Sequence, residues 1–135
     1  MIKTVLSIED DDVTQYLNTE YLETFGFCEK TIMAKNGFEA LEIFRKLENG
    51  ELPMEHFPEV IFLDLNMPMM DGWEFYKVFL KDFPQFKEKT KIFILSSSIN
   101  PVDVVKANQD NGIVSFLSKP LIDENLRVVN SLLGI

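Results

Sequence analysis

The sequence predicts an α/β domain in which a parallel sheet lies between two layers of helices. Five short β-prone runs alternate with five stretches of helical spacing along the 135 residues, and this alternation is typical of parallel sheets with helices on both faces. Two of the runs, residues 60–63 and 91–95, are almost entirely apolar, as expected for strands buried on both sides. We therefore expect one three-layer domain over residues 1–135.

Composition narrows the possible classes of protein. The formal charge of −9 argues against a surface that neutralises nucleic-acid phosphates or anionic lipid, so neither nucleic acid nor membrane is an expected partner. The only cysteine, Cys28, allows no intramolecular disulfide and is expected to be a small packing residue. The start of the chain lacks the apolar core of a signal peptide, and no apolar run could span a membrane, so a cytoplasmic location is expected.

The first two strand–helix units cover residues 4–50. Residues 4–8 form a β-prone run that ends in the four acids 9–12, and Asp11 or Asp12 is expected to cap a helix closed by Gly26. A second strand over residues 31–34 and a turn at residues 36–37 lead to a helix that ends at residues 49–50. The expected inward faces of the two helices consist of Val13, Leu17 and Tyr21, with Tyr16 and Leu22 nearby, and of Phe38, Ala40, Leu41, Phe44 and Leu47.

The last three units begin with the strand at residues 60–63, which ends in Asp64 and a turn-rich segment before a helix from residue 73. The loop before it holds His56, which has no partners at metal-ligand spacing and is expected to be a surface or packing residue. The strand at residues 91–95 ends in three serines, of which Ser98 could cap a helix opened by residues 100–101. The strand at residues 113–117 ends in Lys119, before a proline whose peptide isomer the sequence leaves open, and a helix over residues 121–133 follows.

Polar side chains at the strand ends form the candidate site. Carboxyl ends of parallel strands share one edge of a sheet, so Glu9, Asp10, Asp64, Ser96 and Lys119 are expected to converge there. Three carboxylates favour Mg²⁺, which leaves part of its coordination shell to water or phosphate oxygens. A carboxylate can attack a phosphoryl group, and the cation and Lys119 would neutralise the charge on the transferring oxygens. Asp64 is the candidate nucleophile.

With these residues in order, the chain resembles a response-regulator receiver domain of two-component signalling over essentially its whole length. The resemblance implies a flavodoxin-like fold with strand order 2-1-3-4-5. It also implies that Asp64 is the phosphoacceptor and that Glu9 and Asp10 hold Mg²⁺ together with Asp64 and the backbone carbonyl of Asn66. A receiver of this kind assists its own phosphorylation and dephosphorylation but is not otherwise an enzyme.

The resemblance also assigns a switch and partners. Ser96 matches the hydroxyl that binds the phosphoryl oxygen, Lys119 the lysine that pairs with it, and Phe116 the aromatic switch residue. The donor would be a sensor histidine kinase or a histidine phosphotransfer protein, and the target would bind the face made by the fourth helix, fifth strand and fifth helix, with homodimerisation on phosphorylation as a further option. The chain departs from the commoner pattern with Glu9 for Asp, Ser96 for Thr and Phe116 for Tyr, but each keeps the chemistry required.

Two other functions are compatible with the fold. The first is a constitutive protein-interaction module with a receiver fold that is never phosphorylated, against which the complete set of acids, hydroxyl and lysine argues. The second is a metal-dependent phosphatase or phosphotransferase, but Asn66 stands where such an enzyme would need its general acid. A flavin site is disfavoured because the acids would repel its phosphate. No sequence remains for an output domain, so a stand-alone receiver is expected, with a fragment cut from a longer protein as the alternative.

Overall fold

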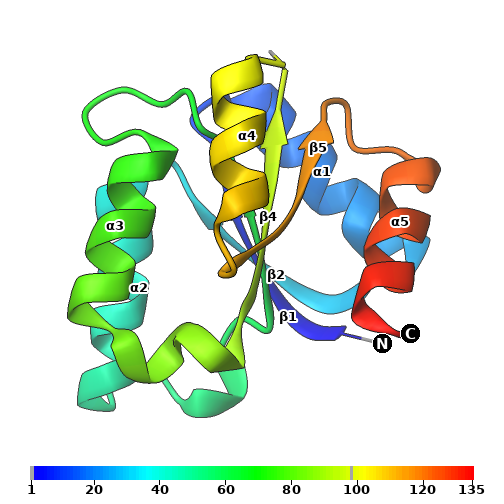
Figure 1. The fold of residues 1–135 in the computed structure, drawn as a ribbon. Helices are drawn as coiled ribbons and strands as arrows, with labels where there is room; N and C mark the ends of the chain where they lie inside the picture. Colours follow the sequence, from blue (N-terminus) through cyan, green and yellow to red (C-terminus); the bar gives the residue numbers. More distant parts are fainter. Residues whose placement is uncertain (1, 98) are drawn as a thin grey trace.

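The computed structural model describes residues 2–97 and 99–135, which form one sheet of parallel strands covered by helices on both faces (Figure 1). The strands are β1 (Ile2–Ile8), β2 (Cys28–Ala34), β3 (Val60–Leu63), β4 (Lys91–Ser96) and β5 (Ile113–Ser118). Their order across the sheet is β2-β1-β3-β4-β5, and each neighbouring pair is parallel. The predicted fold class and strand order are confirmed.

Within the described residues, five α-helices and two short 3₁₀ helices lie between the strands or after the last one. They are α1 (Asp12–Phe25), α2 (Gly37–Asn49), η1 (Met54–His56), α3 (Gly72–Asp82), η2 (Pro84–Lys89), α4 (Pro101–Gln109) and α5 (Asp123–Leu133). Helices α2, α3 and α4 lie on one face of the sheet, and α1 and α5 lie on the other (Figure 1). In the parts of the chain that the structure describes, no helix is both long and apolar enough to cross a membrane.

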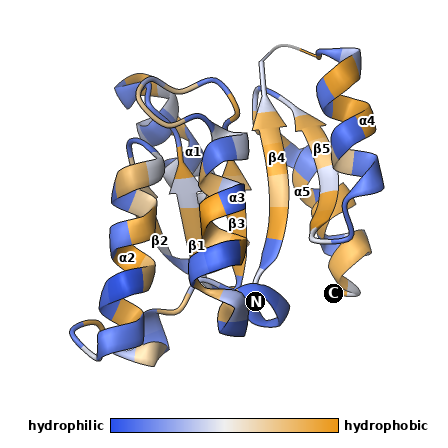
Figure 2. Ribbon diagram, turned by 60° about the vertical axis from the view of Figure 1, so that its left-hand side comes forward, coloured by the Kyte–Doolittle hydropathy of each residue, from blue (hydrophilic) through white to orange (hydrophobic). Residues whose placement is uncertain are grey.

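Each face of the sheet has its own apolar core because successive side chains of a strand point to opposite sides. Val5 and Phe62 pack with Leu22 of α1 and Leu126 of α5. On the opposite face the sheet packs against a cluster of phenylalanines centred on Phe44, whose ring contacts those of Phe57, Phe79, Phe83 and Phe86. Most of β4 is coloured as hydrophobic, whereas the helices alternate between hydrophobic and hydrophilic positions (Figure 2).

The predicted inward face of α1 is wrong for the first half of the helix, whereas Leu22 is buried and Tyr21 packs against the core as expected. Val13, Tyr16 and Leu17 are 67%, 63% and 58% exposed, and the buried residues of this helix are Gln15, Asn18 and Leu22. The inward face therefore begins with polar side chains near the carboxyl edge of the sheet and becomes apolar only further along the helix. The predicted ends of the helix are confirmed, because Asp11 accepts a hydrogen bond from the Thr14 amide and Gly26 adopts the left-handed conformation.

Several other expectations change in detail. Phe38 of α2 is 52% exposed, so the predicted stripe of that helix is shorter, and β2 begins at Cys28 rather than at residue 31 because it pairs with β1 from Ile2 onward. Cys28 is buried, as expected, while His56 is half-buried, with its Nδ1 atom 2.9 Å from the Lys30 Nζ atom. Ser98 lies outside the described residues. The side chain of Asn100 caps α4.

Candidate functional site

The acidic residues emerge side by side because β1 and β3 are neighbours in the sheet. Ile8 pairs with Leu63, the last residue of β3, and the Asp64 amide donates to the Ile8 carbonyl at 3.0 Å. Glu9 and Asp10 follow β1 directly, and Asp64 follows β3 directly. Glu9 and Asp64 are 3% and 5% exposed, whereas Asp10 faces solvent. The strand pairing therefore brings three carboxylates to one point of the edge.

These carboxylates fit a divalent cation. Glu9, Asp10 and Asp64 each offer an oxygen, and the three oxygens lie within 4.8 Å of one another. Two of the acids are buried, where like charges repel strongly and a cation would relieve the repulsion. An all-oxygen set with one open side suits a hard cation that keeps part of its water shell. The cluster could therefore bind a metal ion.

Lys119 reaches this cluster from β5. Its backbone amide donates to the Ser96 carbonyl at 2.8 Å, so the ends of β4 and β5 are joined. Its Nζ atom forms an ion pair with Glu9 and lies 3.6 Å from Oδ2 of Asp64, and the Lys119–Pro120 peptide bond is cis. The residues expected to converge at this edge are thus close together, and Ser96, which is 1% exposed, ends the strand beside them.

Asp64 has an unusual proton affinity. Burial removes its carboxylate from water and the neighbouring Glu9 charge repels it, and although Lys119 acts in the opposite direction, the pKa of Asp64 rises to about 7. Without a bound cation, the site thus carries less negative charge at neutral pH than three ordinary carboxylates would. A cation would favour the ionised form, which is the form able to act as a nucleophile.

This pKa predicts how the stability of the metal-free protein depends on pH. A carboxyl group with a raised pKa in the folded state stabilises the fold below its ordinary pKa, and that stability is lost as the pH rises through about 7. The full shift corresponds to at most about 4 kcal/mol, and water reaching the site should reduce it to about 2 kcal/mol. Between pH 5 and pH 8, wild type should therefore lose about 2 kcal/mol more of its unfolding free energy than Asp64→Asn.

Urea denaturation of both proteins in chelator would measure this difference, with Glu88→Gln as a control because Glu88 is an exposed carboxylate. The control should behave as wild type does. An equal pH dependence in wild type and Asp64→Asn would show that Asp64 is not the group that titrates.

The loop after Asp64 is held close to the site. The Asn66 amide donates to Oδ1 of Asp64 at 3.2 Å, and Asn66 itself is exposed. Asp71 caps α3 through a capping box with Glu74. A Cβ atom at Gly72 would lie 2.6 Å from the Asp64 carbonyl oxygen, so only glycine allows the start of α3 to approach the acidic residue this closely.

Phe116 lies in β5, two residues before the end of the strand. It pairs with Ile94 of β4 and is partly buried against the apolar core shared with α3 and α4. The ring of Phe116 therefore lies on the face of the sheet that α3 and α4 cover.

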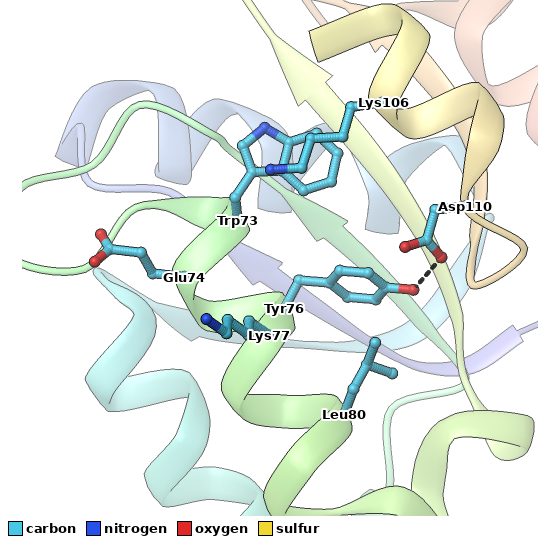
Figure 3. Close-up of a pocket in the computed structure, with 7 residues that line it drawn as sticks. All are labelled: Trp73, Glu74, Tyr76, Lys77, Leu80, Lys106 and Asp110. Carbon is cyan, nitrogen blue, oxygen red and sulfur yellow. Dashed lines mark hydrogen bonds between the residues drawn. The ribbon is translucent and has the colours of Figure 1, made fainter.

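Side chains of α3 also hold α4, which sequence reasoning missed. Trp73 Nε1 donates to Asp103 at 2.9 Å, the Tyr76 hydroxyl donates to Asp110 at 2.5 Å, and the Lys106 ammonium lies 4.4 Å from the centre of the Trp73 ring. An open groove of about 390 Å³ lies between the two helices and is lined in part by Trp73, Tyr76, Lys106 and Asp110 (Figure 3). Ala107 is the only buried residue of α4. Side chains of α3 therefore hold α4 in addition to its packing against β5, and no local pattern in the sequence indicates this contact.

Comparisons with known proteins agree with this geometry. The family model of the response regulator receiver domain matches residues 5–129. A solved two-component response regulator from Cytophaga hutchinsonii is 31% identical with a TM-score of 0.87, and the match covers 99% of this chain and 98% of that chain. The polar-differentiation response regulator DivK of Brucella anthropi is 28% identical over 99% of this chain and 98% of its own length. The solved Mn²⁺-bound form of response regulator Rcp1 is 27% identical with a TM-score of 0.71, over 98% of this chain and 91% of that chain.

The family match runs from the first strand into the last helix, and it includes the edge where the carboxylates and the lysine meet. Receiver domains in general accept phosphoryl groups in two-component signalling and interact with histidine kinases and downstream targets. This chain belongs to the response regulator receiver domains, so it is a phosphoacceptor domain of a signalling protein and not a classical enzyme.

Proposed function

We propose that Asp64 is the residue that accepts the phosphoryl group and that Mg²⁺ is held by Glu9, Asp10 and Asp64 together with the backbone carbonyl of Asn66. The observation that carries this proposal is the meeting of three carboxylate oxygens within 4.8 Å beside the ammonium of Lys119. Asp64 contacts Lys119, as Glu9 does, and it is the acid that follows the central strand of the sheet. The Mn²⁺-bound form of Rcp1 supports a divalent cation at such a site.

In the proposed reaction, a carboxylate oxygen of Asp64 attacks the phosphorus of a phosphohistidine. The bond between phosphorus and the imidazole nitrogen breaks, its electron pair stays on that nitrogen, and an acyl phosphate remains on Asp64. A bound Mg²⁺ would offset negative charge on the transferring oxygens. Attack of water on the same phosphorus would later return the free carboxylate and inorganic phosphate. The domain would thus assist both its own phosphorylation and its own dephosphorylation.

Lys119 and Ser96 would recognise the new phosphoryl group. In the absence of that group the Lys119 ammonium is paired with Glu9 and lies 3.6 Å from Asp64, so a short movement would bring it to a phosphoryl oxygen. Ser96 is joined to Lys119 through the main chain and supplies a hydroxyl at the same edge. Movement of Ser96 towards the added charge of about −1.5 to −2 would leave space for Phe116 to turn inward.

The proposed output face consists of α4, β5 and α5. It carries exposed apolar side chains on both helices, namely Val102 and Val105 on α4 and Val128 and Leu132 on α5. Such a surface suits a downstream protein or a second copy of the chain. The donor would be a sensor histidine kinase or a histidine phosphotransfer protein in the cytoplasm. A receiver-like module that is never phosphorylated is not favoured, because the acidic cluster and its lysine are both present.

Incubation with acetyl phosphate, read as intact mass, tests the proposal. The protein should gain one phosphoryl group when Mg²⁺ is present and none when the cation is chelated, because the carboxylates then repel the donor. A phosphohistidine protein should serve as a second donor, since a small donor can react slowly. Absence of an adduct with both donors in the presence of Mg²⁺ would contradict the proposed function.

A further inference from the structure

Gln15 is a buried polar residue on the first turns of α1. It is 5% exposed, although its apolar neighbours Tyr16 and Leu17 face solvent. Burial of a carboxamide is unfavourable unless its donors and its acceptor are hydrogen-bonded. Helix α1 is therefore oriented so that this one polar side chain is buried, while two large apolar side chains stay exposed.

The Gln15 carboxamide joins the carboxyl ends of two strands. Its Nε2 atom donates to the carbonyls of Ser7 at 2.9 Å and Ala34 at 3.1 Å, with the Glu9 carbonyl further away at 3.5 Å. Its Oε1 atom accepts from the Ser7 hydroxyl at 2.6 Å. Ser7 belongs to β1 and Ala34 ends β2, so a single side chain from α1 connects both strands where the acidic turn, residues 9–11, begins.

Hydrogen bonds of main-chain amides also restrain residues 9–11. The Glu9 amide donates to the Ala34 carbonyl at 3.0 Å, and the Gln15 amide donates to the Asp11 carbonyl at 2.8 Å. The Asp11 amide donates to a carboxylate oxygen of Glu9 at 3.2 Å. Residues 9–11 are thus held between the carboxamide of Gln15 and the first turn of α1.

We propose that Gln15 is a positioning residue for the divalent-cation site. It fixes the main chain of residues 9–11, and this directs the carboxylates of Glu9 and Asp10 towards Asp64. Gln15 does not touch the cation or the phosphoryl group and acts only through the backbone of the residues that bind the cation. This inference rests on the proposed cation site, and it assigns a role to a residue outside the acidic cluster.

The carbonyls and the hydroxyl around Gln15 explain why glutamine suits this position. Ser7 and Ala34 present carbonyl acceptors, and the Ser7 hydroxyl presents a donor, so the site needs an amide nitrogen and an oxygen on one side chain. Leucine or methionine has a similar size but offers no amide donor. Either would leave the turn less restrained without adding a charge beside the carboxylates.

The test is a Mg²⁺ titration followed by NMR, which gives the dissociation constant of the folded protein directly. Gln15→Leu should raise the dissociation constant for Mg²⁺ about tenfold, as expected when a group that orients metal ligands is lost. Gln15→Met should do the same, and its flexible side chain provides a second variant if the leucine variant does not fold. Ser7→Ala, which removes only the hydroxyl bond to Gln15, should have a smaller effect.

Asn18→Leu is the matched control. Asn18 is the other buried polar residue of α1, 7% exposed and one turn further along the helix, where it lines a pocket with Lys119. It takes no part in the hydrogen bonds that Gln15 makes to the ends of β1 and β2. A merely structural role of Gln15 would lower the stability of both α1 variants but leave the dissociation constant for Mg²⁺ unchanged. An unchanged constant in the Gln15 variants, with normal binding by wild type, would overturn the positioning role alone. Absence of Mg²⁺ binding by wild type would overturn both this role and the proposed cation site.

Discussion

Asp64→Asn should abolish the phosphoryl adduct that wild type forms with acetyl phosphate and Mg²⁺. The reaction requires a carboxylate oxygen that attacks phosphorus while the bond from phosphorus to the acetate oxygen breaks and acetate leaves. An amide is a far weaker nucleophile, and the substitution also removes a negative oxygen from the cation site. The expected loss is complete on the time scale at which wild type is fully labelled. Intact mass measured for both proteins in parallel would show it.

Asp82→Asn controls for the loss of an aspartate elsewhere. Asp82 ends α3 and is exposed, so its replacement should leave the adduct unchanged. Asp10→Asn should give a slower reaction rather than none, because it removes a proposed ligand of the cation but not the nucleophile. Labelling of Asp64→Asn at the rate of wild type would mean that another residue accepts the phosphoryl group.

Lys119→Met should destabilise the metal-free protein by about 3 kcal/mol at pH 8, because it leaves the buried carboxylates without the ammonium group that pairs with them. The ammonium of Lys119 pairs with Glu9, which is 3% exposed, and lies 3.6 Å from Asp64. Methionine keeps the length of the side chain, so little packing is lost. Urea denaturation in the presence of chelator would measure the change. Mg²⁺ should restore more stability to this variant than to wild type, because the cation would then be the main positive charge in the cluster.

A double-mutant cycle separates this effect from other losses. Combined with Asp64→Asn, the substitution of Lys119 should cost less than it does alone, since one of the carboxylates is already neutral. Lys87→Met, at an exposed position of η2, should leave stability close to that of wild type. If Lys119→Met were as stable as wild type, the ion pairs of Lys119 would contribute nothing to the fold.

The candidate site was largely predictable because it depends on topology. Alternating strands and helices place every strand end at one edge, so Glu9, Asp64 and Lys119 could be brought together from their positions at the ends of their runs. The residue types then limit the chemistry, because acids and a lysine at one point suit a cation and a phosphoryl group. The roles of these residues in phosphorylation stay predictions, as does the stand-alone nature of the domain.

The face of α1 was not predictable from helical spacing. Apolar residues at Val13, Leu17 and Tyr21 have the spacing of a buried stripe, yet the helix turns Gln15 and Asn18 inward. The inward residues lie over the carboxyl edge, where strand carbonyls need hydrogen-bond donors, and this demand outweighs the burial of exposed apolar side chains. The need for donors to these strand carbonyls can be recognised only when the position of the helix on the sheet is known.

The attachment of α4 was hidden for a similar reason. Trp73 and Tyr76 read as ordinary residues of an amphipathic helix, and their partners Asp103 and Asp110 lie some thirty residues further along the chain. A hydrogen bond between side chains so distant in sequence leaves no periodic signal. The extra residues of β2 arise likewise from pairing with β1, which extends a strand beyond its local β-prone run.

The most direct test of the central claim is to locate the phosphoryl group on the chain. After labelling with acetyl phosphate and Mg²⁺, borohydride reduction converts an aspartyl phosphate into homoserine, which peptide mass spectrometry can assign to one position. We expect homoserine at position 64 of labelled and reduced wild type and at no position of unlabelled protein. Homoserine at any other aspartate, or none in protein whose intact mass shows the adduct, would contradict the assignment of Asp64 as the phosphoacceptor.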